Sequence, residues 1–157
     1  MKIAIAHSPN GLLWLGWREW VSLPELGIEI IKAKVDTGAR TSALHAFQIE
    51  TFRKKGKDRI RFGMHPLQRR THIVITCEAD LIDSRDVMDS GGHSERRYVI
   101  YTPLLIGDQQ WPIEITLTDR DIMNFRMLIG RTAMQGRILI NPDVSYLMGK
   151  PLNPRNF

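Results

Sequence analysis

The sequence predicts an all-β protein, a closed, barrel-like sheet with one short helix near the C-terminus. Apolar and polar residues alternate with a period of two along most of the chain, whereas helical spacing is almost absent. The alternating runs contain β-branched or aromatic residues and are bounded by Gly, Pro, Asn or Asp, as strands usually are. The 157 residues contain no internal repeat and no low-complexity linker, so we expect a single domain over residues 1–157.

The predicted strands are residues 18–21, 28–35, 59–62, 71–78, 98–106, 110–118 and 137–140. Gly107-Asp108 predicts a tight hairpin turn between two of them. Residues 131–135 follow a glycine and end at Gly136, which predicts a helix of about one turn. Residues 79–89 fit helical spacing poorly. Their acidic residues recur every three positions without the central glycine of a calcium loop, and we interpret them as a solvated loop.

The composition is that of a soluble globular protein, with 43% hydrophobic and 25% charged residues. No apolar run approaches the roughly 18 residues of a membrane helix. The apolar start is broken from His7 onward, too early for a signal peptide. The single Cys77 excludes an internal disulfide, and its strand-like surroundings predict an inert core thiol. We therefore expect a cytoplasmic protein without a membrane partner.

The net charge of +5 is unevenly distributed. Residues 53–70 contain eight basic residues and only one acidic residue, Asp58. Such a stretch could bind an anionic partner, or it could be a solvated loop and strand edge kept unpaired by charge. No aromatic residues alternate with the basic ones as they do on a stacking surface, which argues against nucleic acid as the partner.

The most informative segment is residues 30–44, where an apolar strand leads into Asp36-Thr37-Gly38-Ala39. A carboxylate at a strand end followed by Thr and Gly predicts a tight turn, because Gly38 has no Cβ to block close backbone approach. These residues alone leave two interpretations open. Asp36 could be a functional carboxylate, or it could only bond the backbone two residues further on in an Asx turn.

A second motif favours the functional interpretation. Residues 127–134 form an apolar run that closes on Gly130-Arg131 before the predicted helix. Together with the Asp36 turn, this arrangement resembles the retropepsins, which are homodimeric aspartic peptidases. In that family an Asp-Thr-Gly-Ala turn is crossed by a later apolar strand ending in Ile-Gly-Arg. The glycine-rich residues 89–95 match the flap tip of the family. The resemblance covers about residues 18–141, the expected core of the domain, and implies a retropepsin-like (acid protease) fold.

The longer string over residues 34–46 is similar to one bacterial group of this superfamily, labelled ATP-dependent zinc proteases. Its members occur alone or beside an ATP-grasp ligase that adds glutamate to a ribosomal protein. The resemblance therefore implies a glutamate ligase or a ribosomal protein as a partner. The ATP part of the label is not supported here, because Gly149-Lys150 is followed by Pro151 and lacks the glycine spacing of a P-loop.

The zinc part of the label also lacks closely spaced ligands. The five histidines are scattered, none within five residues of another: His7, His45, His65, His72 and His93. A composite zinc site of His45, His93 and Asp36 stays a minor alternative. We expect no cofactor.

The resemblance implies Asp36, Thr37 and Gly38 as the catalytic residues of each chain. Two Asp36 carboxylates brought together would share one proton, because both cannot ionise cheaply. The resemblance also implies residues that contact substrate, and these are Ala39, Arg40, His45, Gly91, Gly92 and Arg131.

Arg40 departs from the retroviral pattern, which has an acidic residue there to pair with the later arginine. Two arginines at these places would repel, so another acid is needed. The nearest candidates are Glu114, Asp119 and Asp121. We interpret Arg40 as a sign of a different groove, suited to an acidic substrate, or as a surface arginine without a role in recognition.

The sequence thus predicts a cytoplasmic aspartic endopeptidase that acts as a homodimer on extended peptide segments. Two alternatives stay open. One is a non-catalytic module that binds and regulates a glutamate ligase or a ribosome-associated partner through residues 53–70. The other is a zinc-dependent peptidase.

Overall fold

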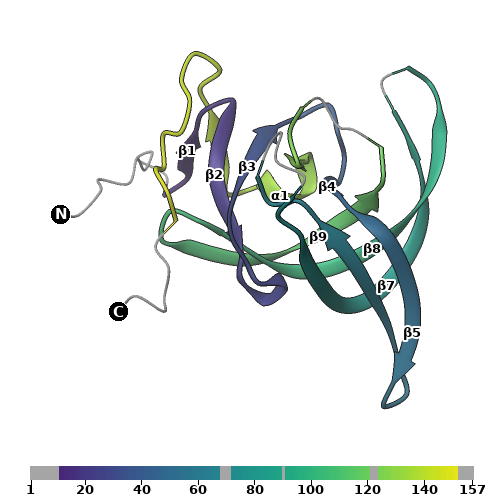
Figure 1. Cartoon of the computed structure of the whole chain (residues 1–157). Helices are drawn as coiled ribbons and strands as arrows, with labels where there is room; N and C mark the ends of the chain where they lie inside the picture. Colours follow the sequence, from purple (N-terminus) through teal and green to yellow (C-terminus); the bar gives the residue numbers. More distant parts are fainter. Residues whose placement is uncertain (1–10, 68–71, 90, 121–123, 152–157) are drawn as a thin grey trace.

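The computed structural model describes residues 11–67, 72–89, 91–120 and 124–151 (Figure 1). Its elements are β1 (Leu13–Leu15), β2 (Arg18–Leu23), the 3₁₀ turn η1 (Pro24–Leu26), β3 (Ile28–Val35), β4 (Ser42–His45), β5 (Phe47–Lys54), β6 (Lys57–Met64), β7 (Ile75–Met88), β8 (Ser94–Ile106), β9 (Gln109–Thr118), β10 (Met127–Ile129), α1 (Arg131–Met134) and β11 (Ile138–Ile140). Over these residues the chain is mostly β with a single short α-helix, as predicted.

Nine of the described strands form one sheet in the order β2-β3-β10-β4-β9-β8-β7-β6-β5, and β1 pairs with β11 in a separate two-stranded sheet. Ser22 of β2 also pairs with Leu105 of β8, so the large sheet bends back on itself. Because this contact is a single residue pair, the closed barrel stays a prediction.

β10 is the strand that positions the site, because it enters the sheet between β3 and β4. It runs parallel to β3, with Ile129 opposite Val35, and antiparallel to β4, with Leu128 opposite Ala43. All three of its residues are buried. The turn that follows β3 therefore lies next to Gly130, which follows β10.

The core confirms the period-two pattern. In β9 the alternate residues Trp111, Ile113, Ile115 and Leu117 are all buried in one hydrophobic cluster with residues of β2, β3, β6, β8 and β10. Cys77 belongs to the same cluster and is 2% exposed, which confirms its core position.

The hairpin turn and the helix also agree with the sequence. Ile106 pairs with Gln109, which leaves Gly107-Asp108 as a two-residue turn, and Gly107 has the positive φ of 59° that such turns favour. α1 begins at Arg131 and ends one residue before the predicted end. Neither described helical segment is long and apolar enough to cross a membrane.

The largest difference from the sequence prediction is β7. The strand expected at residues 71–78 begins at Ile75 and continues to Met88, and residue 71 lies outside the described residues. The interpretation of residues 79–89 as a solvated loop is therefore wrong for all but the end of that segment. The acidic residues of β7 each contact an arginine: Glu78 with Arg61, Asp80 with Arg59, Asp83 with Arg85, and Asp86 with Arg96. β1 and β5 were not predicted either.

Candidate active site

The turn after β3 fixes one oxygen of the Asp36 carboxylate through a backbone hydrogen bond. Asp36 donates its backbone N–H to the carbonyl of Ile129 at 2.9 Å, which ties the turn to β10. Its Oδ1 accepts the backbone N–H of Gly38 at 2.9 Å. The Asx turn considered from the sequence is thus present. Oδ2 has no hydrogen-bond partner among the described residues, and Thr37 and Gly38 are exposed beside it.

Hydrogen bonds from Gly130 and Arg131 join the end of β10 to this turn and to the start of β4. Gly130 donates its N–H to the Ser42 hydroxyl at 3.0 Å, and Arg131 donates its N–H to the Ala39 carbonyl at 2.8 Å. The Arg131 guanidinium also donates Nη1–H to the Thr37 carbonyl at 2.9 Å. Arg131 therefore holds the Asp-Thr-Gly turn directly, a contact that the prediction of a substrate-binding role did not include.

Arg40 is exposed, and Thr132 donates its backbone N–H to the Arg40 carbonyl at 2.9 Å. Of the acids considered as its counterpart, Glu114 forms a two-point contact with Arg85, at 2.5 and 3.1 Å. The Arg85 contact holds the pKa of Glu114 below its ordinary value, with a smaller contribution from the charge of Arg40. Asp121 lies outside the described residues.

A small apolar pair lies beside the turn and is separate from the main core. Ala43 of β4 and Leu128 of β10 are opposite each other and both buried, yet they form a cluster of their own. Their neighbours in the strands, Leu44 and Ile129, belong to the main core. Because side chains alternate along a strand, Ala43 and Leu128 project from the other face of the sheet. The sequence reasoning missed this pair, although the all-apolar β10 is typical of a strand buried on both faces.

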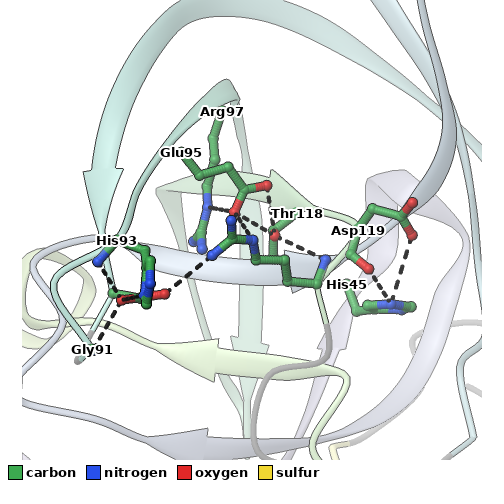
Figure 2. Close-up of polar contacts among 9 residues, drawn as sticks. His45, Gly91, His93, Glu95, Arg97, Thr118 and Asp119 are labelled. Carbon is green, nitrogen blue, oxygen red and sulfur yellow. Dashed lines mark hydrogen bonds and ion pairs between the residues drawn. The ribbon is translucent and has the colours of Figure 1, made fainter.

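Of the residues predicted as the flap tip, 89 and 91–95 are described, and they lie at the end of the hairpin between β7 and β8, the teal-green hairpin in Figure 1. Asp89 Oδ1 accepts the backbone N–H groups of Gly91 and His93, each at 2.9 Å. Gly92 has a positive φ of 83°, which favours glycine. Figure 2 shows this loop beside Glu95, Arg97 and Thr118.

His45 lies at the end of β4, where Nε2 is 3.1 Å from the Asp119 carbonyl and 4.0 Å from its carboxylate (Figure 2). His45 Nδ1 is buried without a hydrogen-bond partner. No three His, Cys, Asp or Glu side chains within the described parts of the chain gather as metal ligands would. Asp36, His45 and His93, all described, therefore do not form the composite zinc site, and the residues do not fit that metal.

In the described part of the basic stretch, the arginines of the β5–β6 hairpin form ion pairs and the lysines at its end do not. The arginines are paired: Arg53 with Asp58, Arg59 with Asp80, and Arg61 with Glu78. The lysines at the hairpin end, Lys54, Lys55 and Lys57, are exposed and have no ion-pair partner among the described residues. Residues 69–70 lie outside the described residues. The paired arginines agree with the interpretation of a charged strand edge, and binding of an anionic partner by the lysines stays a prediction.

An Asp-Thr-Gly turn tied to a crossing Ile-Gly-Arg strand, in a mostly β chain with one short helix, defines the class of retropepsin-like proteins. The comparison with protein families agrees. The RimB-like family, described as retropepsin-like aspartic endopeptidase RimB, matches residues 14–151, and the chain belongs to this family.

Curated relatives carry a different name. The chain is 43% identical over 136 residues to a "Probable alpha-L-glutamate ligase" of Shewanella pealeana, covering 87% of this chain and 30% of the relative. Proteins of the same name from Desulfotalea psychrophila and Parasynechococcus marenigrum are 46% and 48% identical, covering 87% and 86% of this chain and 29% of each relative. The chain thus spans less than a third of the length of these relatives.

A solved structure shares the fold. A protein of unknown function from Legionella pneumophila superimposes with a TM-score of 0.72 and 24% identity, covering 86% of this chain and 97% of that one.

Proposed function

We propose that this chain is one half of an aspartic endopeptidase, in which two copies bring their Asp36 carboxylates together at a two-fold axis. The observation that carries the proposal is the Asp36 turn itself. Oδ1 is fixed by the Gly38 N–H, and Oδ2 has no hydrogen-bond partner within the part of the chain that the structure describes, on a turn that β10 and Arg131 hold in place. A carboxylate oriented by its own backbone and open on the other side can act on a water molecule. Membership in the retropepsin-like family supports the same conclusion.

The reaction needs both carboxylates. One ionised Asp36 takes a proton from water, and the water oxygen forms a bond to the peptide carbonyl carbon. The protonated Asp36 of the second copy gives its proton to the carbonyl oxygen. When the tetrahedral intermediate collapses, the C–N bond breaks, the nitrogen receives a proton, and a carboxylic acid and an amine leave. The two carboxylates titrate as a unit, as in other aspartic peptidases.

The substrate in this proposal is an extended, acidic peptide. Arg40 is exposed next to the turn, and Ala39, His45, Gly91, Gly92 and Arg131 are the other residues we assign to its binding. The name of the relatives, alpha-L-glutamate ligase, supports glutamate residues as the acidic groups. The expected location is the cytoplasm, where the free thiol of Cys77 stays reduced.

Two variants test the proposal on a glutamate-rich peptide and on a neutral peptide. Asp36→Asn should lower cleavage by at least about 10²-fold, because the amide cannot accept the proton from water. Arg40→Glu should lower cleavage of the glutamate-rich peptide while Asp36 chemistry on a neutral peptide continues. A chelator should not change either rate, because the proposal includes no metal. Inhibition by the chelator, restored by zinc, would contradict it.

A mixing experiment tests the pairing of the two copies. An equal amount of Asp36→Asn protein is added to a fixed amount of wild type under conditions of subunit exchange. Random assortment leaves about half of the wild-type activity, because mixed dimers contain only one carboxylate. An unchanged activity would mean that a single chain suffices and would overturn the shared site.

A second candidate function is favoured by the relatives. A segment similar to this chain occurs within much longer proteins named as ligases, so the domain could serve as a binding or regulatory module for such a ligase. Under that alternative, Asp36→Asn leaves partner binding intact. The exposed tip lysines are the natural contact, and replacing Lys54, Lys55 and Lys57 by glutamine should then abolish binding, measured by calorimetry.

A further inference from the structure

The outer half of the β7–β8 hairpin is a two-stranded ribbon without a third strand. β7 pairs with β6 only up to Asp80, and β8 pairs with β9 only from Val99 onward. Between these points and the tip, β7 and β8 pair with each other alone among the described strands, from Asp83 opposite Val99 to Met88 opposite Ser94. An isolated two-stranded hairpin is only marginally stable, so side-chain contacts must determine where this ribbon lies.

Arg120, just after the end of β9, provides such a contact at the tip. Its Nη1 is 3.1 Å from Asp89 Oδ2, and its Nε is 3.5 Å from Glu95 Oε2. Its backbone N–H donates to the Thr118 hydroxyl at 3.1 Å. One guanidinium thus joins the last turn of the hairpin to the end of a central strand.

Asp89 couples the shape of the tip to this attachment. One carboxylate oxygen accepts the N–H groups of Gly91 and His93, and the other contacts Arg120. The hydrogen bond from the His93 N–H, the one from Gly91, and the nearby charges of His93 and Arg120 lower the pKa of Asp89. The same carboxylate therefore shapes the loop and fastens it.

Glu95 fixes the other side of Arg120. Both of its oxygens lie 3.1 Å from the Thr118 hydroxyl, and Oε2 accepts Nε–H of Arg97 at 3.2 Å (Figure 2). Arg97 is only 8% exposed. A single exposed ion pair stabilises little, but a pair anchored on a largely buried network keeps its geometry.

We propose that Arg120 fastens the tip of the β7–β8 hairpin to the end of β9 through Asp89, so that this contact determines where the end of the hairpin lies. The proposal does not depend on the peptidase function, and it can be measured in the absence of any substrate.

Hydrogen exchange of the intact chain, followed by mass spectrometry, tests the fastening. Arg120→Gln and Asp89→Asn remove the charge contact, and the asparagine keeps Oδ1 as the acceptor for Gly91 and His93. Each should speed exchange in residues 86–88 and 94–96 by roughly 3- to 10-fold, whereas the base of the ribbon stays attached to β9 through Arg85 and Glu114. The double variant should exchange no faster than Arg120→Gln alone, because Asp89→Asn removes a contact that Arg120→Gln has already lost. Arg120→Lys, which keeps the charge, should retain most of the protection.

Asp86→Asn is the matched control. Asp86 and Arg96 form an exposed ion pair within the same ribbon, at 3.4 Å, without attachment to β9. Its loss should leave exchange at the tip unchanged. Equal exchange in Arg120→Gln and wild type, or additive effects in the double variant, would overturn the proposal. So would an Asp86→Asn effect as large as that of Arg120→Gln.

Discussion

The thiol of Cys77 shows how burial decides the chemistry of a single side chain. Burial in the core raises its pKa to about 11, so the thiol stays protonated at neutral pH. Because the thiolate is the reactive form, the native chain should resist iodoacetamide at pH 7.5 and react fully in denaturant. The sequence contains no other cysteine, so mass spectrometry of the intact chain reports Cys77 alone. Rapid alkylation of the folded protein would contradict the buried position.

Single residues of the site could be predicted where their role is local. The motif consists of three consecutive residues, Asp36, Thr37 and Gly38. Their turn depends on one hydrogen bond, from the Gly38 N–H to the Asp36 carboxylate two positions earlier, so the motif itself predicts the turn. The bond from Arg131 to the Thr37 carbonyl spans 94 positions. It exists only because β10 enters the sheet between β3 and β4, and no local pattern contains that information.

At the scale of elements, the crossing of β10 and the Asp36 turn depends on one glycine. A Cβ at Gly130 would lie 2.4 Å from the Thr41 carbonyl carbon and 2.7 Å from the Ser42 nitrogen. Backbone atoms cannot move aside as a flexible side chain can, so Gly130→Ala should lower the free energy of unfolding by about 1–3 kcal/mol or more. Urea unfolding measures the change.

Gly38→Ala is the control for that prediction. There the added Cβ meets only the Asp36 carboxylate, at 3.2 Å, and a side chain can adjust. Its free energy of unfolding should stay much closer to that of the wild type. Equal losses in the two variants would mean that the crossing is less tightly packed than the contacts of Gly130 indicate.

β7 shows why some strands could not be predicted from the sequence. Its pairing with β8 shifts by one residue between Leu81 and Asp83, which breaks the alternation that identifies a strand. None of the residues from Leu81 to Met88 in its outer half is buried, so no apolar face is required there. β5 was missed for a related reason, because it is the edge strand of the sheet and contains mostly exposed residues.

At the scale of the whole molecule, residues 144–146 are hydrogen-bonded to residues 17 and 18 at the start of β2. These ordered contacts extend beyond the core expected at residues 18–141. Trp17 donates its N–H to the Val144 carbonyl, and Tyr146 donates its N–H to the Arg18 carbonyl. A Cβ at Gly16 would lie only 2.3 Å from the Val144 oxygen, so the two segments touch through their backbones. Residues 141–150 show little alternation, because these contacts involve backbone groups rather than a patterned apolar face.

Glu19 joins these segments and makes their attachment testable. Its carboxylate is fully buried and accepts the backbone N–H groups of Gly16, Leu147 and Met148 at 2.6, 3.0 and 3.1 Å. In Glu19→Gln the amide NH₂ must face an N–H donor, which leaves a buried donor without an acceptor. The free energy of unfolding should fall by about 1–3 kcal/mol. Glu29→Gln, an exposed change on β3, should cost little.

The pH dependence of that loss follows from the pKa of Glu19. Burial raises this pKa, although the N–H groups of Gly16, Met148 and Leu147 oppose the shift. A carboxyl whose pKa is higher in the folded chain binds more protons there, so its stabilising contribution is complete below the unfolded pKa and is lost as pH rises through the folded value.

Glutamine does not titrate. The difference in unfolding free energy between wild type and Glu19→Gln should therefore be largest near about pH 4 and narrow toward neutral pH. Urea titrations at several pH values measure it. A difference that widens with pH would mean that the three N–H groups outweigh burial and that Glu19 prefers to be ionised in the folded chain.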